Sequence, residues 1–321
     1  MTDLAQPAFD PELAVAYDAI AGHLIRPASY EDILRMRASG LGAPPPETFD
    51  SLGIAVREIH MTGYQGHPLR AVVLEPTQRS RAAPCIYKIH GGAMIVGNPY
   101  TGIQSALPWI TENRAVVVSI EYRLAPENPD PIPVEDCYAG LEWLVEHADE
   151  LDIDAARIML AGSSAGGGLA AGVALLARDR RGPSVIGQVL MCPMLDDRNE
   201  TVSVQQYHDV GTHTGAGNRY AWSALLGDRV GGPDVSPYTA PARASHLAGL
   251  PPTFLDCGAA EPFRDETVAY ATQLWTDGVQ TELHIWEGAF HGFDVLAPHA
   301  AISRAAISAR NAWVARMLAR D

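Results

Sequence analysis

Short apolar runs alternate with amphipathic stretches along most of the chain. Residues 56–61 alternate between apolar and polar, and 69–76 would pair with them across a turn containing Gly63 and Gly66. The run 115–120 is apolar enough to be buried on both faces, as in a parallel sheet. The predicted strands are 56–61, 69–76, 85–90, 115–120, 157–161, 185–192, 252–257 and 282–286. They predict an α/β fold with a mostly parallel eight-stranded sheet flanked by helices.

Helical spacing fills the intervals between most of these strands. The predicted helices are 102–113, 134–151, 265–277 and 301–319. Two regions do not fit this alternation: residues 1 to about 45, which are alanine-rich and helical in pattern, and residues 196–244, which are polar and glycine-rich. We expect these two regions to pack together as a helical cap, and the whole chain, 1–321, to form a single domain.

Composition and charge exclude several classes of partner. The chain has 321 residues, 47% of them hydrophobic, with a formal net charge of −15. Such an acidic balance argues against nucleic acid or an anionic membrane as partner. No apolar stretch approaches the ~18 residues of a membrane span, and residues 1–7 lack the basic start of a signal peptide. We therefore expect a cytoplasmic protein.

The four cysteines lie far apart, and none forms a C-x-x-C pair. Cys85, Cys192 and Cys257 fall in apolar runs that resemble buried strands, and free cysteine is among the most buried residue types. We therefore expect core residues, with neither a metal site nor a disulfide framework.

The strongest chemical signal is a Gly-x-Ser-x-Gly frame after the strand 157–161. Ser164 has Gly162 two residues before it and Gly166 two residues after it, whereas Ser163 lacks both. A small-residue run then continues as a helix. A serine on such a tight strand-to-helix turn projects its hydroxyl above the sheet edge as a nucleophile. Alone, the frame is also compatible with an ordinary loop.

A base and an acid are needed to activate such a serine. Among eleven histidines, His291 stands on a glycine-flanked loop directly after the last predicted strand. The loop after the preceding strand carries Glu261, a carboxylate able to orient the imidazole, with Asp265 and Asp256 as alternatives. Chain order Ser164, Glu261, His291 is that of the α/β hydrolases.

Backbone donors for an oxyanion are predicted on both sides of the serine. Gly91, Gly92 and Ala93 follow His90 after the third strand, and glycine lets backbone N–H groups approach a substrate closely. The N–H of Ala165, directly after the nucleophile, would supply the other side. We expect His90 to hold this loop through hydrogen bonds rather than to act as a base.

These motifs resemble the hormone-sensitive-lipase-like esterases (bacterial family IV) of the α/β-hydrolase superfamily, from about residue 55 onward. The matching segments are 90–92, 121–127, 162–168, 261–266 and 291–293. Residues 195–198 and 238–241 further resemble the branch that includes bacterial heroin esterase. The resemblance implies a cap over the pocket, hydrolysis of short- to medium-chain carboxylic esters, no cofactor and frequent homodimers.

Three positions depart from the family pattern. Ala93 replaces the third loop glycine, Ser163 stands where the family usually has aspartate, and Glu261 replaces the usual aspartate. Alanine keeps the N–H but loses freedom at positive φ. In the segment 121–127, we expect Arg123 to pair with Glu127 or Asp136 and so stiffen the loop.

The predicted function is therefore a serine carboxylesterase acting on a small-molecule ester. The alternatives are a non-catalytic small-molecule-binding protein on the same scaffold, and an amidase or acyltransferase. Residues proposed to line the pocket are Met94, Tyr207, Trp222 and Phe290, although these residue types are more often part of the core.

Overall fold

An eight-stranded, mostly parallel sheet forms the centre of the computed structural model, which describes residues 4–39, 44–78 and 82–320. The strand order is β1-β2-β4-β3-β5-β6-β7-β8; β1 pairs antiparallel with β2, β2 pairs antiparallel with β4, and the other pairings are parallel. The strands are β1 (Ile54–Thr62), β2 (Pro68–Pro76), β3 (Ala83–Ile89), β4 (Val116–Ile120), β5 (Ile153–Ser163), β6 (Gly187–Met191), β7 (Thr253–Gly258) and β8 (Thr281–Trp286). The predicted fold class is confirmed.

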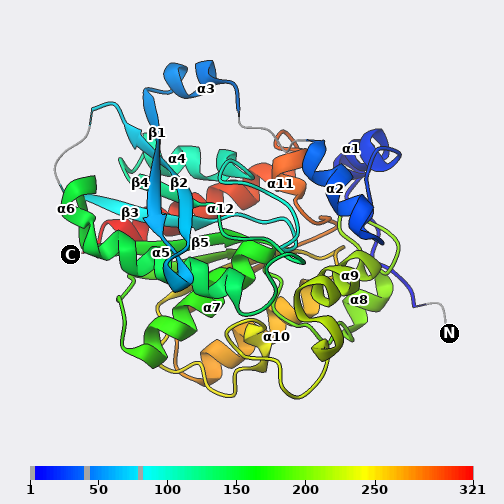
Figure 1. The fold of residues 1–321 in the computed structure, drawn as a ribbon. Helices are drawn as coiled ribbons and strands as arrows, with labels where there is room; N and C mark the ends of the chain where they lie inside the picture. Colours follow the sequence, from blue (N-terminus) through cyan, green and yellow to red (C-terminus); the bar gives the residue numbers. More distant parts are fainter. Residues whose placement is uncertain (1–3, 40–43, 79–81, 321) are drawn as a thin grey trace.

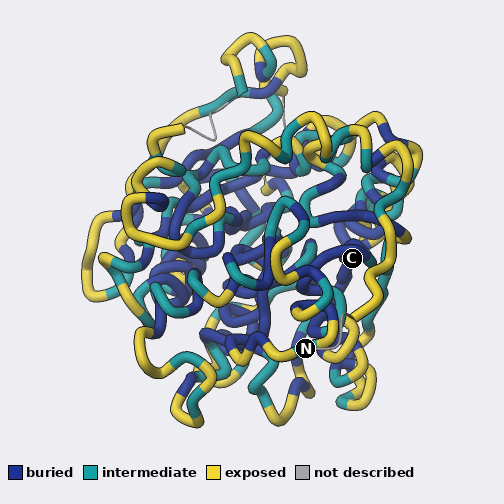
Figure 2. The backbone as a smooth tube through the Cα atoms, turned by 90° about the vertical axis from the view of Figure 1, so that its right-hand side faces the viewer, coloured by how far each residue is buried: buried dark blue, intermediate teal, exposed yellow. Residues whose placement is uncertain are grey.

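Helices cover both faces of the sheet (Figure 1). On one face, α5 (Ile132–Glu146), α7 (Ala165–Arg180) and α10 (Arg264–Thr276) bury apolar side chains against the strands. On the other face, α4 (Leu107–Thr111) and α12 (Ala301–Leu318) do the same. Buried backbone is concentrated in the interior and exposed backbone at the rim (Figure 2), as expected when apolar residues drive the packing.

Some predicted elements differ in extent. The helix expected at 102–113 is a 3₁₀ turn, Ile103–Ala106, followed by the short α4. Residues 134–151 form α5 and a separate turn of helix, α6 (Ala148–Leu151). The sequence analysis did not predict α3 (Pro46–Ser51), which begins within the three prolines because proline is tolerated in a first helical turn.

The two regions outside the alternation lie against each other. The N-terminal region contains α1 (Pro11–Ala21) and α2 (Tyr30–Ala38); the second contains α8 (Val202–Gln206) and α9 (Gly215–Leu226). Asp10 and Ser29 cap the first two helices by accepting backbone N–H groups. The Tyr207 hydroxyl donates to Pro7 O (2.7 Å), and Gly211 N donates to the Tyr17 hydroxyl (3.3 Å). Residues 1–3 and 40–43 of the expected cap lie outside the described residues.

None of the described helices combines the length and apolarity that crossing a lipid bilayer requires.

Candidate active site

Ser164 occupies a strained turn between β5 and α7. Its backbone lies at φ 58° and ψ −125°, a region that costs a non-glycine residue roughly 1–3 kcal/mol and tends to occur at functional sites. Backbone hydrogen bonds hold it there: Ser164 N donates to Met191 O (2.8 Å), and Ser164 O accepts from Met194 N (3.0 Å). A Cβ on Gly166 would lie 2.1 Å from Ile89 O, so the turn requires glycine at this position.

His291 lies between Ser164 and Glu261. Its Nε2 is 3.0 Å from Ser164 Oγ, and its Nδ1 contacts Glu261 Oε2. Glu261 Oε1 accepts from Gly258 N (3.0 Å), which fixes the carboxylate at the end of β7. With Nδ1 protonated toward the carboxylate, Nε2 is free to accept the serine proton. The arrangement matches a nucleophile, a base and an orienting acid.

The surroundings of His291 shift its pKa. Burial disfavours the charged imidazole, whereas the neighbouring Cys192 and the Glu261 carboxylate favour it, and together they raise the pKa of His291 well above its usual value. The alternative acids have other partners. Asp256 accepts from Arg310 Nη2 (2.7 Å), and Asp265 accepts from Ser203 N (2.7 Å).

The loop after β3 lies beside the elbow because β3 and β5 are neighbours, with Ile89 opposite Gly162. A Cβ on Gly91 would lie 3.3 Å from Ser164 Cβ. Gly92 and Ala93 both have positive φ (116° and 54°), so alanine here adopts the left-handed conformation that the sequence analysis identified as restricted. Ala165 is the first residue of α7, so its N–H is free of intrahelical bonds.

His90 holds this loop. Its Nδ1 lies 2.7 Å from Gly91 O, its ring stacks on Tyr122 at a centroid distance of 4.2 Å, and the Tyr122 hydroxyl donates to His90 O (3.0 Å). Burial lowers the pKa of His90 to about 3, so the ring is neutral at ordinary pH. These contacts attach His90 to its own loop, whereas the histidine that contacts Ser164 Oγ is His291.

A cavity of about 540 Å³ opens above Ser164 and His291. This volume lies within the range of small-molecule sites. Its aliphatic lining residues are Leu24, Ile25, Pro27, Met36, Ile95, Val96, Val295 and Leu296. Gly91, Gly92 and Ala93 line it as well, so the cavity joins the nucleophile to the loop after β3.

The four residues predicted to line the pocket lie elsewhere. Met94, Tyr207, Trp222 and Phe290 are all at most 1% exposed, and none of them is among the residues lining the cavity. Phe290 packs edge-on against Phe9, at 5.6 Å between ring centroids. That prediction is corrected: these large apolar side chains point into the core, where their burial is most favourable.

Two neighbours of His291 were missed by the sequence analysis. His213, on the loop before α9, lines the cavity with its ring centroid 5.1 Å from that of His291. Burial, aided by the His291 charge, lowers the pKa of His213 to about 3. Cys192, directly after β6, contributes a thiol next to His291 and Glu261. Its place at the carboxyl end of a predicted strand was the available signal.

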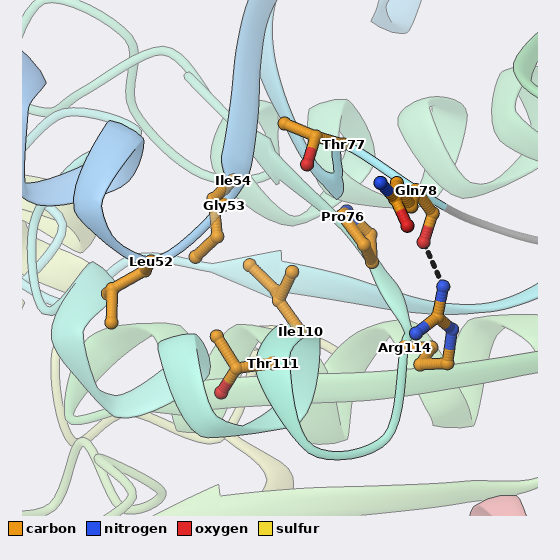
Figure 3. Close-up of a pocket in the computed structure, with 9 residues that line it drawn as sticks. All are labelled: Leu52, Gly53, Ile54, Pro76, Thr77, Gln78, Ile110, Thr111 and Arg114. Carbon is orange, nitrogen blue, oxygen red and sulfur yellow. Dashed lines mark hydrogen bonds between the residues drawn. The ribbon is translucent and has the colours of Figure 1, made fainter.

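A second hollow of about 200 Å³ lies between the starts of β1 and β4 and the end of β2 (Figure 3). This is the opposite edge from Ser164, because β2 runs antiparallel and Leu74, near its end, pairs with Val117 near the start of β4. Arg114, the charged residue in the lining, donates to Gln78 O. Among the described residues that line this hollow, none is a serine, cysteine, histidine or carboxylate.

The sheet topology and the serine on a strand-to-helix elbow define the class of α/β hydrolases. The chain belongs to the alpha/beta hydrolase fold family, which matches residues 86–295. Carboxylesterase NlhH of Mycobacterium tuberculosis (strain ATCC 25618 / H37Rv) is 34% identical over 296 residues, covering 90% of each chain.

Solved structures of esterases show the same likeness. The structure titled Bacterial Heroin Esterase has a TM-score of 0.87 at 36% identity and covers 98% of this chain and 99% of its own. Esterase LipW from Mycobacterium marinum has a TM-score of 0.86 at 34% identity, covering 98% and 99%. The resemblance to hormone-sensitive-lipase-like esterases, and to the branch containing heroin esterase, is confirmed.

Proposed function

We propose that the protein is a serine carboxylesterase that hydrolyses short- to medium-chain esters through an acyl-enzyme on Ser164. The observation that carries this proposal is the 3.0 Å contact between His291 Nε2 and Ser164 Oγ, with Glu261 at the other ring nitrogen. The carboxylesterase and esterase names of the relatives support the same activity.

In the proposed mechanism, Ser164 Oγ attacks the ester carbonyl carbon while His291 Nε2 takes the hydroxyl proton. The resulting oxyanion accepts hydrogen bonds from the N–H groups of Gly91, Gly92 or Ala93, and Ala165. His291 returns the proton to the alcohol as the ester bond breaks. Water, losing a proton to His291, then attacks the acyl-enzyme, and the proton goes back to Ser164 as the acid leaves.

The lining of the 540 Å³ cavity supports the substrate class. Apolar side chains from the N-terminal region, such as Leu24 and Met36, and from the short helix α11 (Phe293–Leu296), such as Leu296, favour an apolar acyl or alcohol group. A panel of p-nitrophenyl esters of increasing acyl length should show a maximum of kcat/KM at short to medium chains.

The test of the nucleophile compares neighbouring serines. Ser164→Ala should abolish p-nitrophenyl butyrate hydrolysis and labelling by a fluorophosphonate probe. In a serine protease, removal of the triad nucleophile lowers kcat by about 10⁶-fold. Ser163→Ala should keep both, because the hydroxyl that contacts His291 Nε2 belongs to Ser164. Hydrolysis by the Ser164 variant at the wild-type rate would reject the proposal.

The alternative functions differ in what they predict for this test. A binding protein without catalysis is not favoured, because the relatives are named as esterases and because the base is present. An amidase or acyltransferase would use the same acyl-enzyme, and would transfer the acyl group to an added amine or alcohol faster than to water.

We propose further that residues 1–45 and 196–244 act as a cap over the substrate, and that the protein forms homodimers in the cytoplasm. Cap residues from the first region and Thr212 and His213 from the second contribute to the cavity, which supports the first statement. The family resemblance supports a dimer, which light scattering would test. The free cysteines fit a reducing compartment, and the net charge of −15 gives no basis for a nucleic-acid partner.

A further inference from the structure

The thiol of Cys192 meets two members of the proposed triad. One side-chain donor atom each of Cys192, Glu261 and His291 lies within 4.8 Å of the other two. The backbone holds Cys192 in this place: its φ is 37°, and its N–H donates to Asp256 O (2.6 Å) at the end of the neighbouring strand β7. A non-glycine residue with positive φ beside a reactive site is a feature that calls for a functional explanation.

The three donors form a set suited to one kind of metal ion. Thiolate sulfur, imidazole nitrogen and carboxylate oxygen are the ligands of tetrahedral zinc, whereas magnesium and calcium prefer oxygen alone. The charges also match, because one thiolate and one carboxylate neutralise a divalent cation in a buried place, where an uncompensated charge would be costly. Glu261 is 1% exposed, so a cation bound to it needs this charge neutralisation from its ligands.

We propose that Cys192, Glu261 and His291 bind Zn²⁺, and that the bound ion inhibits the enzyme. The ring nitrogen involved is Nδ1, which already faces Glu261. Binding releases the thiol proton to solvent, moves the single ring proton of neutral His291 from Nδ1 to Nε2, and forms metal bonds to Sγ, Nδ1 and a Glu261 oxygen. The fourth position of the tetrahedron is left for water.

Inhibition follows from the tautomer of His291. With Nδ1 on the metal, the remaining ring proton sits on Nε2, which then donates to Ser164 Oγ instead of accepting its proton. Glu261 is also withdrawn from its role as partner of the imidazolium. His291 lines the cavity, so the ion can arrive by the route that the substrate takes. The inhibitory part of this inference rests on the proposed esterase function; the binding part does not.

The binding test therefore uses a protein without turnover. Ser164→Ala protein, titrated with Zn²⁺ in a calorimeter, should bind one ion, and Co²⁺ should give the near-ultraviolet charge-transfer band of a cobalt–thiolate bond. Adding Cys192→Ser should weaken Zn²⁺ binding by at least about tenfold and abolish that band. Cys137→Ala, which changes a buried cysteine of α5 outside this cluster, should alter neither.

Activity gives the second readout. Zn²⁺ should inhibit p-nitrophenyl butyrate hydrolysis by the wild type and by the Cys137 variant equally, and Mg²⁺ should not inhibit. In Cys192→Ser or Cys192→Ala, the Zn²⁺ concentration for half-inhibition should rise at least about tenfold. Equal sensitivity of the wild type and both Cys192 variants, or a cobalt complex without the thiolate band, would overturn the proposal. Absence of ester hydrolysis in every form would instead reject the proposed function and leave calorimetry to decide on the metal site.

Discussion

Arg37 of α2 forms a two-bond ion pair with Glu127 on the loop after β4 (Nη1–Oε1 2.7 Å, Nη2–Oε2 2.9 Å). The same guanidinium donates to Ile95 O and Ala125 O, both at 2.8 Å. Ile95 lines the cavity, so one side chain joins the N-terminal region to the cavity wall and to the loop after β4. Arg123 pairs instead with Asp136 (2.7 Å), the second of the two partners expected from the sequence.

Arg37→Met should lower the free energy of unfolding by about 1–2 kcal/mol, because two backbone carbonyls lose a charged donor. The ion pair itself contributes little of this, since its side chains are 26% and 39% exposed. Arg35→Met is the matched control on the same helix. Arg35 is 62% exposed and contacts Asp32 of its own helix, so urea unfolding should change by less than about 0.5 kcal/mol.

Acid should weaken the Arg37–Glu127 link in a defined range. The Arg37 hydrogen bond lowers the pKa of Glu127 from 4.5 to about 2. The link therefore stabilises the fold fully above about pH 4.5 and loses its effect as the pH falls toward about 2. In urea titrations, the stability difference between the wild type and Glu127→Gln should shrink over this range. A difference that stayed constant would contradict the assignment.

Glu261→Gln should reduce kcat by about 10²–10⁴-fold, because an amide orients the imidazole poorly and does not stabilise its charge. The pH profile gives a separate check. Since Glu261 helps to raise the pKa of His291, and since only the neutral imidazole accepts a proton, the acid limb of kcat/KM should move to lower pH in this variant. Asp265→Asn, in the first turn of α10 just after Glu261, should leave both the rate and the limb nearly unchanged. The reverse ranking would transfer the role to Asp265.

Lys88, fully buried in β3, should make stability depend on alkaline pH. Its Nζ donates to Thr101 O (2.8 Å), and burial lowers its pKa from 10.5 to about 8. Between these values the unfolded chain binds the extra proton, so the folded state gains stability as the pH rises, by up to about 1.4 kcal/mol per pH unit. Lys88→Met should lack this gain. Parallel pH dependence of unfolding in the two proteins would show that Lys88 titrates normally.

Ala93→Gly should stabilise the protein by about 0.5–1 kcal/mol. Alanine at φ 54° carries a conformational cost of about 1–2 kcal/mol that glycine avoids, and the greater freedom of glycine in the unfolded chain offsets part of the gain. Ester hydrolysis should persist, because the N–H is retained. A lower melting temperature in the variant would show that the Ala93 methyl contributes packing that exceeds its strain.

Strand positions were predictable where the sequence carried an unambiguous period. The run of β4, which is apolar except for Ser119, and the alternating run of β1 each indicate a strand, and the structure contains both strands. The early start of β5 was not predictable, because Ile153 joins the sheet only by pairing with Ala83, a contact distant along the chain. The exchange of β3 and β4 in the sheet order is likewise a property of the crossover connections.

The parts of the site that depend on local backbone geometry were predicted from the sequence. The parts that depend on the direction in which a side chain points were missed. The glycines around Ser164 indicated an elbow in the sequence, and in the structure a Cβ at Gly162 or Gly166 would collide with backbone atoms. Trp222 and Phe290 are apolar residues, which occur both in cavity walls and in the core. Their residue types therefore did not indicate that both side chains are buried in the core. Cys192 was assigned to the core for the same reason, although its backbone turns the thiol toward His291.

The backbone of Ser164 has no spare hydrogen-bonding group: its N–H binds Met191 O, and its C=O accepts from Gly167, Gly168 and Met194. An acyl group attached to Oγ is therefore bound to a residue whose backbone is held in place by hydrogen bonds. During acylation and deacylation, the alcohol, the water molecule and the acid move into and out of the site, while the backbone at Ser164 keeps its position.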